Sequence, residues 1–234
     1  MEGPSVELEA MKQHYREQLV EHQDTARACS WKSEDVANRN FSAVAQVFLR
    51  NEEPFSVYEI GSGVGAMAEF LRAHVPLARY SGCDILPEMI ERAKARDSTL
   101  DVEVRNVLTD PPTRQYDYVL ISGLFNLRME NDPELWQRFV EQMLLAAFKI
   151  AKKGIASNFL TGHVEWTREL GYYQNPAKIL DYAICNLSRF CDIRHSYYPW
   201  EFTLCVYREP VAIPFAPAFP WPPEQTNQPD GRAF

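Results

Sequence analysis

The spacing of hydrophobic and polar residues divides this chain into segments with two different periods. Apolar residues three and four positions apart indicate the buried face of a helix, whereas alternation or a short apolar run indicates a strand. Helical patterns cover residues 4–27, 32–50, 67–71, 87–96, 133–152 and 176–187. Strand patterns cover residues 55–60, 79–84, 100–105, 116–122, 155–159, 191–196 and 201–207.

Local signals set the ends of several helices. Pro87 occupies the first turn of its helix, where the N–H that proline lacks is not needed. Asp132 followed by Pro133 caps the long helix that begins there, and Gly154 is expected to end it. Ser33 starts the second helix, but the residue three positions later is not the acid of a full capping box.

The order of the predicted elements indicates the fold class. Strands alternate with helices from residue 55 onward, which is typical of βαβ units with a largely parallel sheet covered on both faces. The last two strands are separated by about four residues, whereas a parallel crossover needs a dozen or more. The sequence therefore predicts an α/β fold with a mostly parallel, seven-stranded sheet that ends in an antiparallel hairpin.

Composition and charge exclude some classes of binding partner. The chain has 234 residues, enough for one large domain, and its 24 Lys+Arg against 32 Asp+Glu give a net charge of −8. Tight, sequence-independent binding of nucleic acid or an anionic membrane needs clustered cations, so we expect neither partner. No run approaches the roughly 20 apolar residues of a membrane span, and the charged N-terminus has no secretory pattern. Five cysteines without a CxxC pair predict a cytoplasmic protein with no disulfide framework and no metal site.

A glycine-rich loop follows the first strand. Gly61, Gly63 and Gly65, with Ser62 between the first two, join that strand to a helix. Glycine lets the backbone turn tightly and approach a ligand, and the helix N-terminus offers free N–H groups. The spacing also satisfies the dinucleotide pattern GxGxxA, so the loop alone leaves the ligand open.

Two carboxylates near the loop indicate which kind of ligand it binds. Glu59 lies two residues before the first glycine, where a carboxylate suits a cationic amine and repels a pyrophosphate. Asp84 ends the second strand, where an acid accepts hydrogen bonds from ribose hydroxyls. A ligand with an ammonium group and a ribose but no phosphate is S-adenosylmethionine.

These motifs resemble those of the class I S-adenosylmethionine-dependent methyltransferases. The residues that carry the resemblance are 59–65, 83–89, 106–107 and 116–122, together with the terminal hairpin, and the match covers roughly residues 54–208. The segments 15–41, 158–163 and 197–208 look like those of a bacterial subgroup that acts on small molecules. The resemblance implies a Rossmann-like fold, this cofactor with S-adenosylhomocysteine as product, and methyl transfer to an oxygen or nitrogen atom of a metabolite, plausibly a biosynthetic intermediate.

The resemblance also implies a role for each matching residue. Glu59 and the backbone of residues 61–65 would hold the methionine end, and Asp84 the ribose. Ile85 and Met89 would pack on the adenosine, and Asn106 and Val107 would lie beside the adenine. Ser122 and Gly123 would line the floor of the cofactor site. Many members of the family have aspartate at position 106, but the asparagine carbonyl is still able to accept from the adenine amino group.

Catalytic and substrate-binding residues are expected beyond the carboxyl ends of the strands, where open α/β sheets bind their ligands. His163 is the best candidate for a general base, because imidazole titrates near neutrality, although a solvated loop histidine fits equally well. His195 and Tyr197 are further catalytic candidates, and His195 also fits a purely structural role. Trp31 would cover the cofactor, and Phe125 follows the fourth strand on the cofactor side. The candidates for substrate binding are Asn126, Asn158, Thr161, Glu165, Tyr198 and Trp200.

The chain divides into three predicted parts within a single domain. Residues 1–50 form an N-terminal helical lid, residues 51–208 the catalytic core, and residues 209–234 a proline-rich and aromatic arm that lies extended on the body or on a second subunit. We expect a monomer or a homodimer. Three alternatives stay open: a non-methylating reaction with the same cofactor, an NAD(P) oxidoreductase, and an inactive partner subunit that keeps only the fold.

Overall fold

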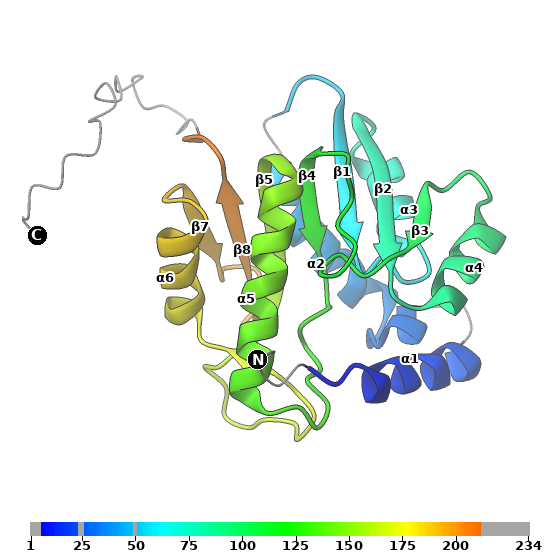
Figure 1. Ribbon diagram of the computed structural model, residues 1–234, viewed down its shortest axis with the longest axis horizontal. Coiled ribbons are helices and arrows are strands. Elements are labelled where there is room, and N and C mark those ends of the chain that lie inside the picture. The colour runs from blue at the N-terminus through cyan, green and yellow to red at the C-terminus, as the bar shows by residue number, and fades with distance from the viewer. Residues whose placement is uncertain (1–5, 23–25, 49–50, 212–234) are drawn as a thin grey trace, which may run out of the picture.

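One β-sheet forms the centre of the computed structural model, which describes residues 6–22, 26–48 and 51–211 (Figure 1). Its strand order is β3-β2-β1-β4-β5-β8-β7, and β6 pairs with β5 off this path. The strands are β1 (Phe55–Ile60), β2 (Ala78–Asp84), β3 (Val102–Val104), β4 (Tyr116–Ile121), β5 (Ala151–Thr161), β6 (Tyr173–Gln174), β7 (Cys191–Arg194) and β8 (Glu201–Tyr207). The seven predicted strands are all present. The eighth, β6, has two residues and is too short for a period to reveal.

Strand directions agree with the predicted mostly parallel sheet. The pairs β1–β2, β1–β4, β2–β3 and β4–β5 are parallel. Strand β8 is antiparallel to both of its neighbours, β5 and β7, so the predicted terminal hairpin is confirmed. The parallel strands place the carboxyl ends of β1, β2 and β4 at one edge of the sheet, beside helix α1 (Figure 1).

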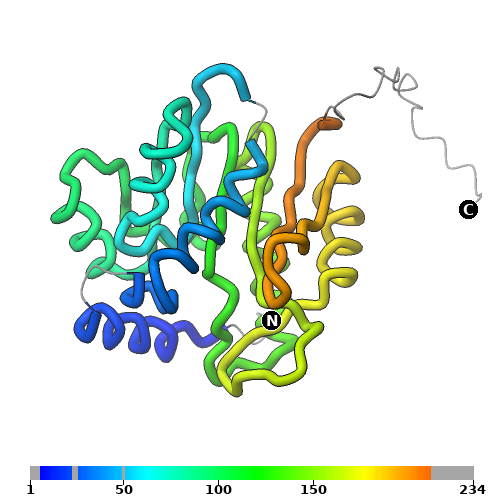
Figure 2. The backbone as a smooth tube through the Cα atoms, turned by 180° about the vertical axis from the view of Figure 1, so that it is seen from behind, coloured from blue at the N-terminus to red at the C-terminus, as the bar shows by residue number. Residues whose placement is uncertain are grey.

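Helices cover both faces of the sheet. They are α1 (Glu9–His22), α2 (Glu34–Ala45), α3 (Ala66–His74), α4 (Pro87–Arg96), α5 (Pro133–Ile150) and α6 (Pro176–Asn186), with short 3-10 turns η1 (Ala26–Cys29) and η2 (Gln46–Phe48). Helices α5 and α6 lie on the face seen in Figure 1, and α2 and α3 on the face seen in Figure 2. Each face has its own apolar core, because successive strand residues point to opposite sides.

The end of α5 differs from the sequence prediction. The helix ends at Ile150 rather than at Lys152, and β5 starts at the next residue without a loop. Gly154 does not terminate the helix. It lies inside β5, where the carbonyl oxygen of Val206 is 2.7 Å from the position a Cβ atom would take, so glycine allows β8 to approach closely.

The N-terminal segment forms two short helical elements where the pattern predicted one longer helix. Within residues 4–27 the described helix is Glu9–His22, followed by η1. Ser33 caps α2 as expected, since its hydroxyl accepts a hydrogen bond from the Val36 N–H at 3.3 Å. The expected arm lies outside the described residues from position 212 onward. In the described part of the chain, no helix has the length and apolar character that crossing a membrane requires.

Candidate functional site

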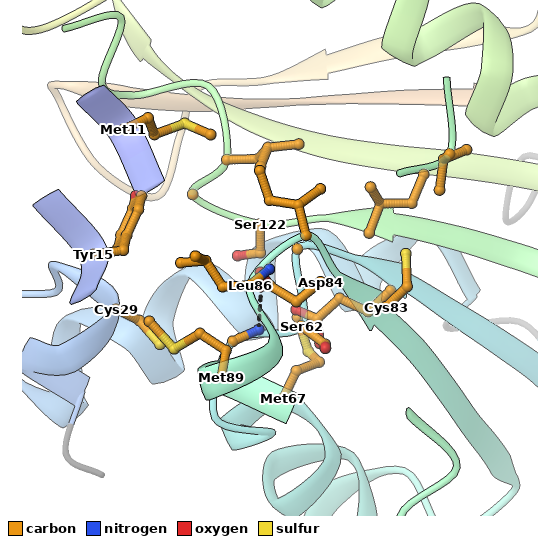
Figure 3. A pocket seen from close by; sticks show the side chains of 18 of the residues that line it. Met11, Tyr15, Cys29, Ser62, Met67, Cys83, Asp84, Leu86, Met89 and Ser122 are labelled. Carbon is orange, nitrogen blue, oxygen red and sulfur yellow. Dashed lines mark hydrogen bonds between the residues drawn. The ribbon is translucent and has the colours of Figure 1, made fainter. Parts of the chain in front are cut away.

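A cavity that is open to solvent lies at the carboxyl ends of β1, β2 and β4 (Figure 3). The glycine loop and the strand ends form one side of it. Residues of α1 and η1 form another side, and α5 contributes Phe139 and Met143. The cavity therefore lies where ligands bind in open α/β sheets, between the sheet and the N-terminal segment.

The backbone of the glycine loop is held in a conformation that favours glycine. Gly61, Gly63 and Gly65 have φ angles of +81°, +52° and +81°. The N–H groups of Gly61 and Ser62 donate to the carbonyl oxygen of Cys83 at 2.8 and 2.9 Å, which fixes the loop against β2. A Cβ atom at Gly63 would lie 2.6 Å from the Cys29 sulfur, so the loop also packs tightly against η1.

The carboxylate of Asp84 organises the other side of the loop. Its Oδ2 accepts from the Gly63 N–H and its Oδ1 from the Leu86 N–H, both at 2.9 Å. Burial raises the pKa of Asp84, and these backbone hydrogen bonds oppose the rise. A carboxylate has about four acceptor positions. The backbone N–H groups do not use all of them, so Asp84 is still able to accept from a hydroxyl group in the cavity.

Glu59 is the most deeply buried acid in the cavity wall, with 3% of its surface exposed. The hydroxyl of Tyr80 donates to its Oε2 at 2.5 Å. Burial raises the pKa of Glu59 to about 8, the charge of Asp84 adds to the rise, and the hydrogen bond from Tyr80 opposes it. When no cation lies beside Glu59, its surroundings therefore favour the neutral acid. A cation bound there would favour the carboxylate.

Ser122 and Gly123 directly follow β4 and line the cavity. The Ser122 hydroxyl is buried and has no hydrogen-bond partner among the described residues, so it is free to bond a ligand. Gly123 has a φ of +77°, and its N–H donates to Asn158 Oδ1 at 2.8 Å. Asn158 in turn donates to Asn40 Oδ1 at 3.1 Å. A Cβ at Gly123 would lie 2.7 Å from the ring of Trp31.

Helix α1 closes the cavity on the side facing away from the sheet. Met11 and Tyr15 of α1 point toward the cavity, opposite Met89 and Leu86 (Figure 3). The segment before α1 is tethered to the β4–α5 loop, because Asn131 exchanges two hydrogen bonds with the backbone of residue 7, at 2.8 and 3.0 Å. The assignment of residues 1–50 as a lid stays a prediction.

Most of the residues predicted to bind the cofactor come together in this one cavity. They are Trp31, Glu59, Gly61, Ser62, Gly63, Asp84, Ile85, Met89, Asn106, Val107, Ser122 and Gly123. Their individual roles stay predictions. At Asn106, the side-chain carbonyl already accepts from the Leu108 N–H at 3.0 Å, so only its second lone pair is open to an adenine amino group.

Two further predicted cofactor residues do not line the cavity. Gly65 lies beneath the loop, where a Cβ atom would be 2.9 Å from Leu100. Phe125 is fully buried and stacks on Phe159 in the core, with ring centroids 5.4 Å apart.

The predicted catalytic residues also lie outside the cavity lining. His163 is exposed, and its backbone N–H donates to the Thr161 hydroxyl at 3.3 Å. His195 Nε2 lies 3.2 Å from the Pro199 carbonyl oxygen, and the hydroxyl of Tyr197 lies 3.1 Å from that of Thr203. The predicted substrate residues that are likewise absent from the lining are Asn126, Asn158, Thr161, Glu165, Tyr198 and Trp200. Their roles stay predictions as well.

Several cavity residues were missed by reasoning from the sequence. Tyr80, Tyr15, Cys29 and Met11 were not expected at the site, although Tyr80 contacts Glu59 and the other three line the cavity. Only Tyr80 had a usable signal: it lies two residues before Gly82 in a strand and so shares its face. The others depend on how the N-terminal segment folds back over the sheet.

Comparison with known proteins agrees with this geometry. Residues 58–146 match a protein family described as a methyltransferase domain. Rv1506c of Mycobacterium tuberculosis (strain ATCC 25618 / H37Rv), which its name describes as a methyltransferase, is 28% identical over 157 residues, covering 66% of this chain and 93% of that protein.

Two solved structures show the same fold at low sequence identity. Magnesium protoporphyrin IX methyltransferase from Synechocystis PCC 6803 with bound SAM is 16% identical, with a TM-score of 0.54 over 74% of this chain and 80% of that one. The complex of DhpI with SAM and HEP is 16% identical, with a TM-score of 0.61 over 88% of this chain and 99% of that one.

Proposed function

We propose that this chain is an S-adenosylmethionine-dependent methyltransferase that transfers the methyl group to an oxygen or nitrogen atom of a small-molecule metabolite. The observation that carries the proposal is the shared cavity of Glu59, Asp84 and the glycine loop. This combination suits a ligand with an ammonium group and a ribose. It disfavours a dinucleotide, because a pyrophosphate offers the buried Glu59 carboxyl group no cation to pair with.

The residues present fit this cofactor. Glu59 would bind the ammonium group, Asp84 the ribose hydroxyls, and the buried hydroxyl of Ser122 would gain the partner that it lacks. Asn106 and Val107 would flank the adenine. S-adenosylmethionine supplies a methyl group on a positively charged sulfur, so the protein's main contributions are to place the acceptor and to exclude water.

The cover over the cavity supports a small acceptor. Helix α1 and η1 lie across the cavity, and their Met11, Tyr15 and Cys29 line it. A covered cavity admits a small molecule more readily than the surface of a folded macromolecule. The relatives named for small substrates, such as magnesium protoporphyrin IX methyltransferase, support the same class. We also propose a cytoplasmic enzyme, a monomer or a homodimer, whose acceptor is a biosynthetic intermediate.

The first test is binding of S-adenosylhomocysteine by isothermal titration calorimetry. We expect micromolar affinity for the wild type, loss of binding in Asp84→Ala, and no change in Asp181→Ala, an exposed aspartate on α6. Unchanged affinity in Asp84→Ala would refute the ribose assignment. Binding of NADH, seen by its fluorescence, with no binding of S-adenosylhomocysteine would favour an oxidoreductase, and binding of neither would favour an inactive partner subunit.

The second test is the mass of the product. Incubation with S-adenosylmethionine and a panel of phenols, amines and carboxylic acids is expected to add one CH₂ to at least one acceptor. Consumption of the cofactor without that gain in mass would indicate the non-methylating alternative.

A further inference from the structure

We propose that Tyr80 is a positioning residue for Glu59: its hydroxyl orients the Glu59 carboxylate toward the ammonium group of the cofactor and couples cofactor binding to the release of one proton. This inference rests on the proposed function. It goes beyond it by assigning a role to a residue on β2 that does not line the cavity.

The sheet register brings the two side chains together. Glu59 of β1 is paired with Gly82 of β2, and Tyr80 lies two residues before Gly82, so Tyr80, Gly82 and Glu59 share one face. The hydroxyl of Tyr80 lies 2.9 Å from the position that a Cβ of Gly82 would take. Glycine at position 82 therefore leaves the space through which the Tyr80 ring crosses to the neighbouring strand and donates to Glu59 Oε2 at 2.5 Å.

The same glycine admits the cofactor loop. The position of a Gly82 Cβ would also be 3.0 Å from the Ser62 Cβ and 3.2 Å from the Glu59 carbonyl oxygen. One missing side chain thus lets both the Tyr80 hydroxyl and the glycine loop close around Glu59. Because Tyr80 donates to Oε2, the other carboxylate oxygen, Oε1, is left for a ligand.

The charges around Glu59 decide its protonation. The groups that act on it are Tyr80 and Asp84 of β2, and Cys29 of η1 is influenced by its charge. Burial and the Asp84 carboxylate both disfavour a second negative charge. The pKa of Tyr80 is raised well above its usual value, so its hydroxyl keeps its proton and remains a donor.

The proton balance of binding follows from these groups. When an ammonium group arrives, the Glu59 O–H bond breaks, its proton passes to the buffer, and the carboxylate forms an ion pair with the ligand. No bond of the cofactor changes. The hydrogen bond from Tyr80 is stronger to this carboxylate than to the neutral acid, because bonds to charged groups are the stronger ones.

The experiment is a double-mutant cycle for S-adenosylhomocysteine binding with Tyr80→Phe and Glu59→Gln. We expect Tyr80→Phe to weaken binding about tenfold or more in the wild-type background, since a hydrogen bond to a charged group is lost. In the Glu59→Gln background it should weaken binding by less than about threefold, because no carboxylate is left to stabilise. Tyr58→Phe is the matched control: Tyr58 is adjacent to Glu59 on β1 but donates to Glu103 at 3.1 Å, so its removal should leave the affinity unchanged.

A second ligand and a measurement on the wild type complete the test. Binding of 5′-methylthioadenosine, which has the nucleoside but no amino acid, should be unchanged in Tyr80→Phe. Calorimetry in two buffers of different ionisation enthalpy at pH 7 should show nearly one proton released per S-adenosylhomocysteine bound to the wild type.

Distinct results would overturn the inference. They are equal losses in both backgrounds, a loss for 5′-methylthioadenosine, or binding to the wild type without proton release. If Tyr80→Phe fails to fold, the calorimetry of the wild type still tests the proton release, and its absence would overturn that part of the inference. Complete absence of S-adenosylhomocysteine binding to the wild type would instead overturn the proposed function.

Discussion

Replacing Glu59 with glutamine is expected to stabilise the ligand-free protein while weakening cofactor binding. Glutamine has nearly the same shape and still accepts the hydrogen bond from Tyr80, but it carries no charge. The carboxyl group of Glu59 is buried, and its pKa is raised to about 8 from the ordinary value of 4.5. The folded state therefore favours the protonated acid, whereas the unfolded chain ionises near pH 4.5.

The magnitude follows from proton linkage. A raised acid pKa means that the folded state holds a proton that the unfolded state has lost, so stability falls as the pH rises between about 4.5 and 8. At pH 7 the difference from the unfolded value is about 2.5 pH units, which at 1.36 kcal/mol per unit is about 3 kcal/mol. Glutamine removes this penalty, which corresponds to an increase in Tm of about 6–12 °C for a domain of this size.

Thermal unfolding at pH 4.5 and pH 7 measures the effect. We expect Glu59→Gln to unfold at nearly the wild-type temperature at pH 4.5 and well above it at pH 7. The control is Glu69→Gln on α3, whose exposed side chain pairs with Arg96 and should show no such gain. A Glu59→Gln variant that is no more stable than the wild type at pH 7 would contradict the claim that Glu59 is destabilised by burial. The same variant should bind S-adenosylhomocysteine at least about tenfold more weakly, because the ion pair is lost.

Three further outcomes are expected. Gly63→Ala should destabilise the fold by about 1–2 kcal/mol because its φ is +52°, and should weaken cofactor binding. Adding Cys29→Ala should restore only the part of the lost free energy of unfolding that comes from the 2.6 Å contact with the sulfur. Full recovery, measured by urea unfolding, would refute the claim that the positive φ of Gly63 causes the rest. Asn131→Ala removes both hydrogen bonds to the backbone of Glu7, so proteolysis before α1 and cofactor release should both become faster; unchanged rates would argue against a tether. Ending the chain after Glu209 should leave cofactor affinity unchanged and alter only turnover or oligomer size, and loss of affinity would place the arm at the cofactor site.

The residues that the sequence predicted well are those whose position depends on one strand and the turn after it. Gly61 and Asp84 each follow a recognisable strand, and the ends of adjacent parallel strands meet at one edge of a sheet. Their convergence in one cavity needed only the order of the strands. The antiparallel hairpin was equally accessible, because a link of about four residues excludes a parallel crossover.

The residues that the sequence did not reveal depend on contacts between distant segments. Trp31 was expected to cover the cofactor, but the packing of its ring on Gly123 and of Cys29 on Gly63 follows from the path of the N-terminal segment. His163 was also predicted from its local position, and its role stays a prediction. A position just past a strand end suggested chemistry, yet its side chain is exposed and does not line the cavity.

The α/β class, the parallel sheet with its terminal hairpin, and the loop and acids proposed to bind the cofactor all follow from the sequence alone. These features are encoded within single elements by hydrophobic period, glycine and charge. Which side chains surround Glu59 depends on contacts between distant segments. Strand register places Gly82 opposite Glu59 and so admits the hydroxyl of Tyr80, and the burial that raises the pKa of Glu59 arises only when the strands and the N-terminal segment pack together.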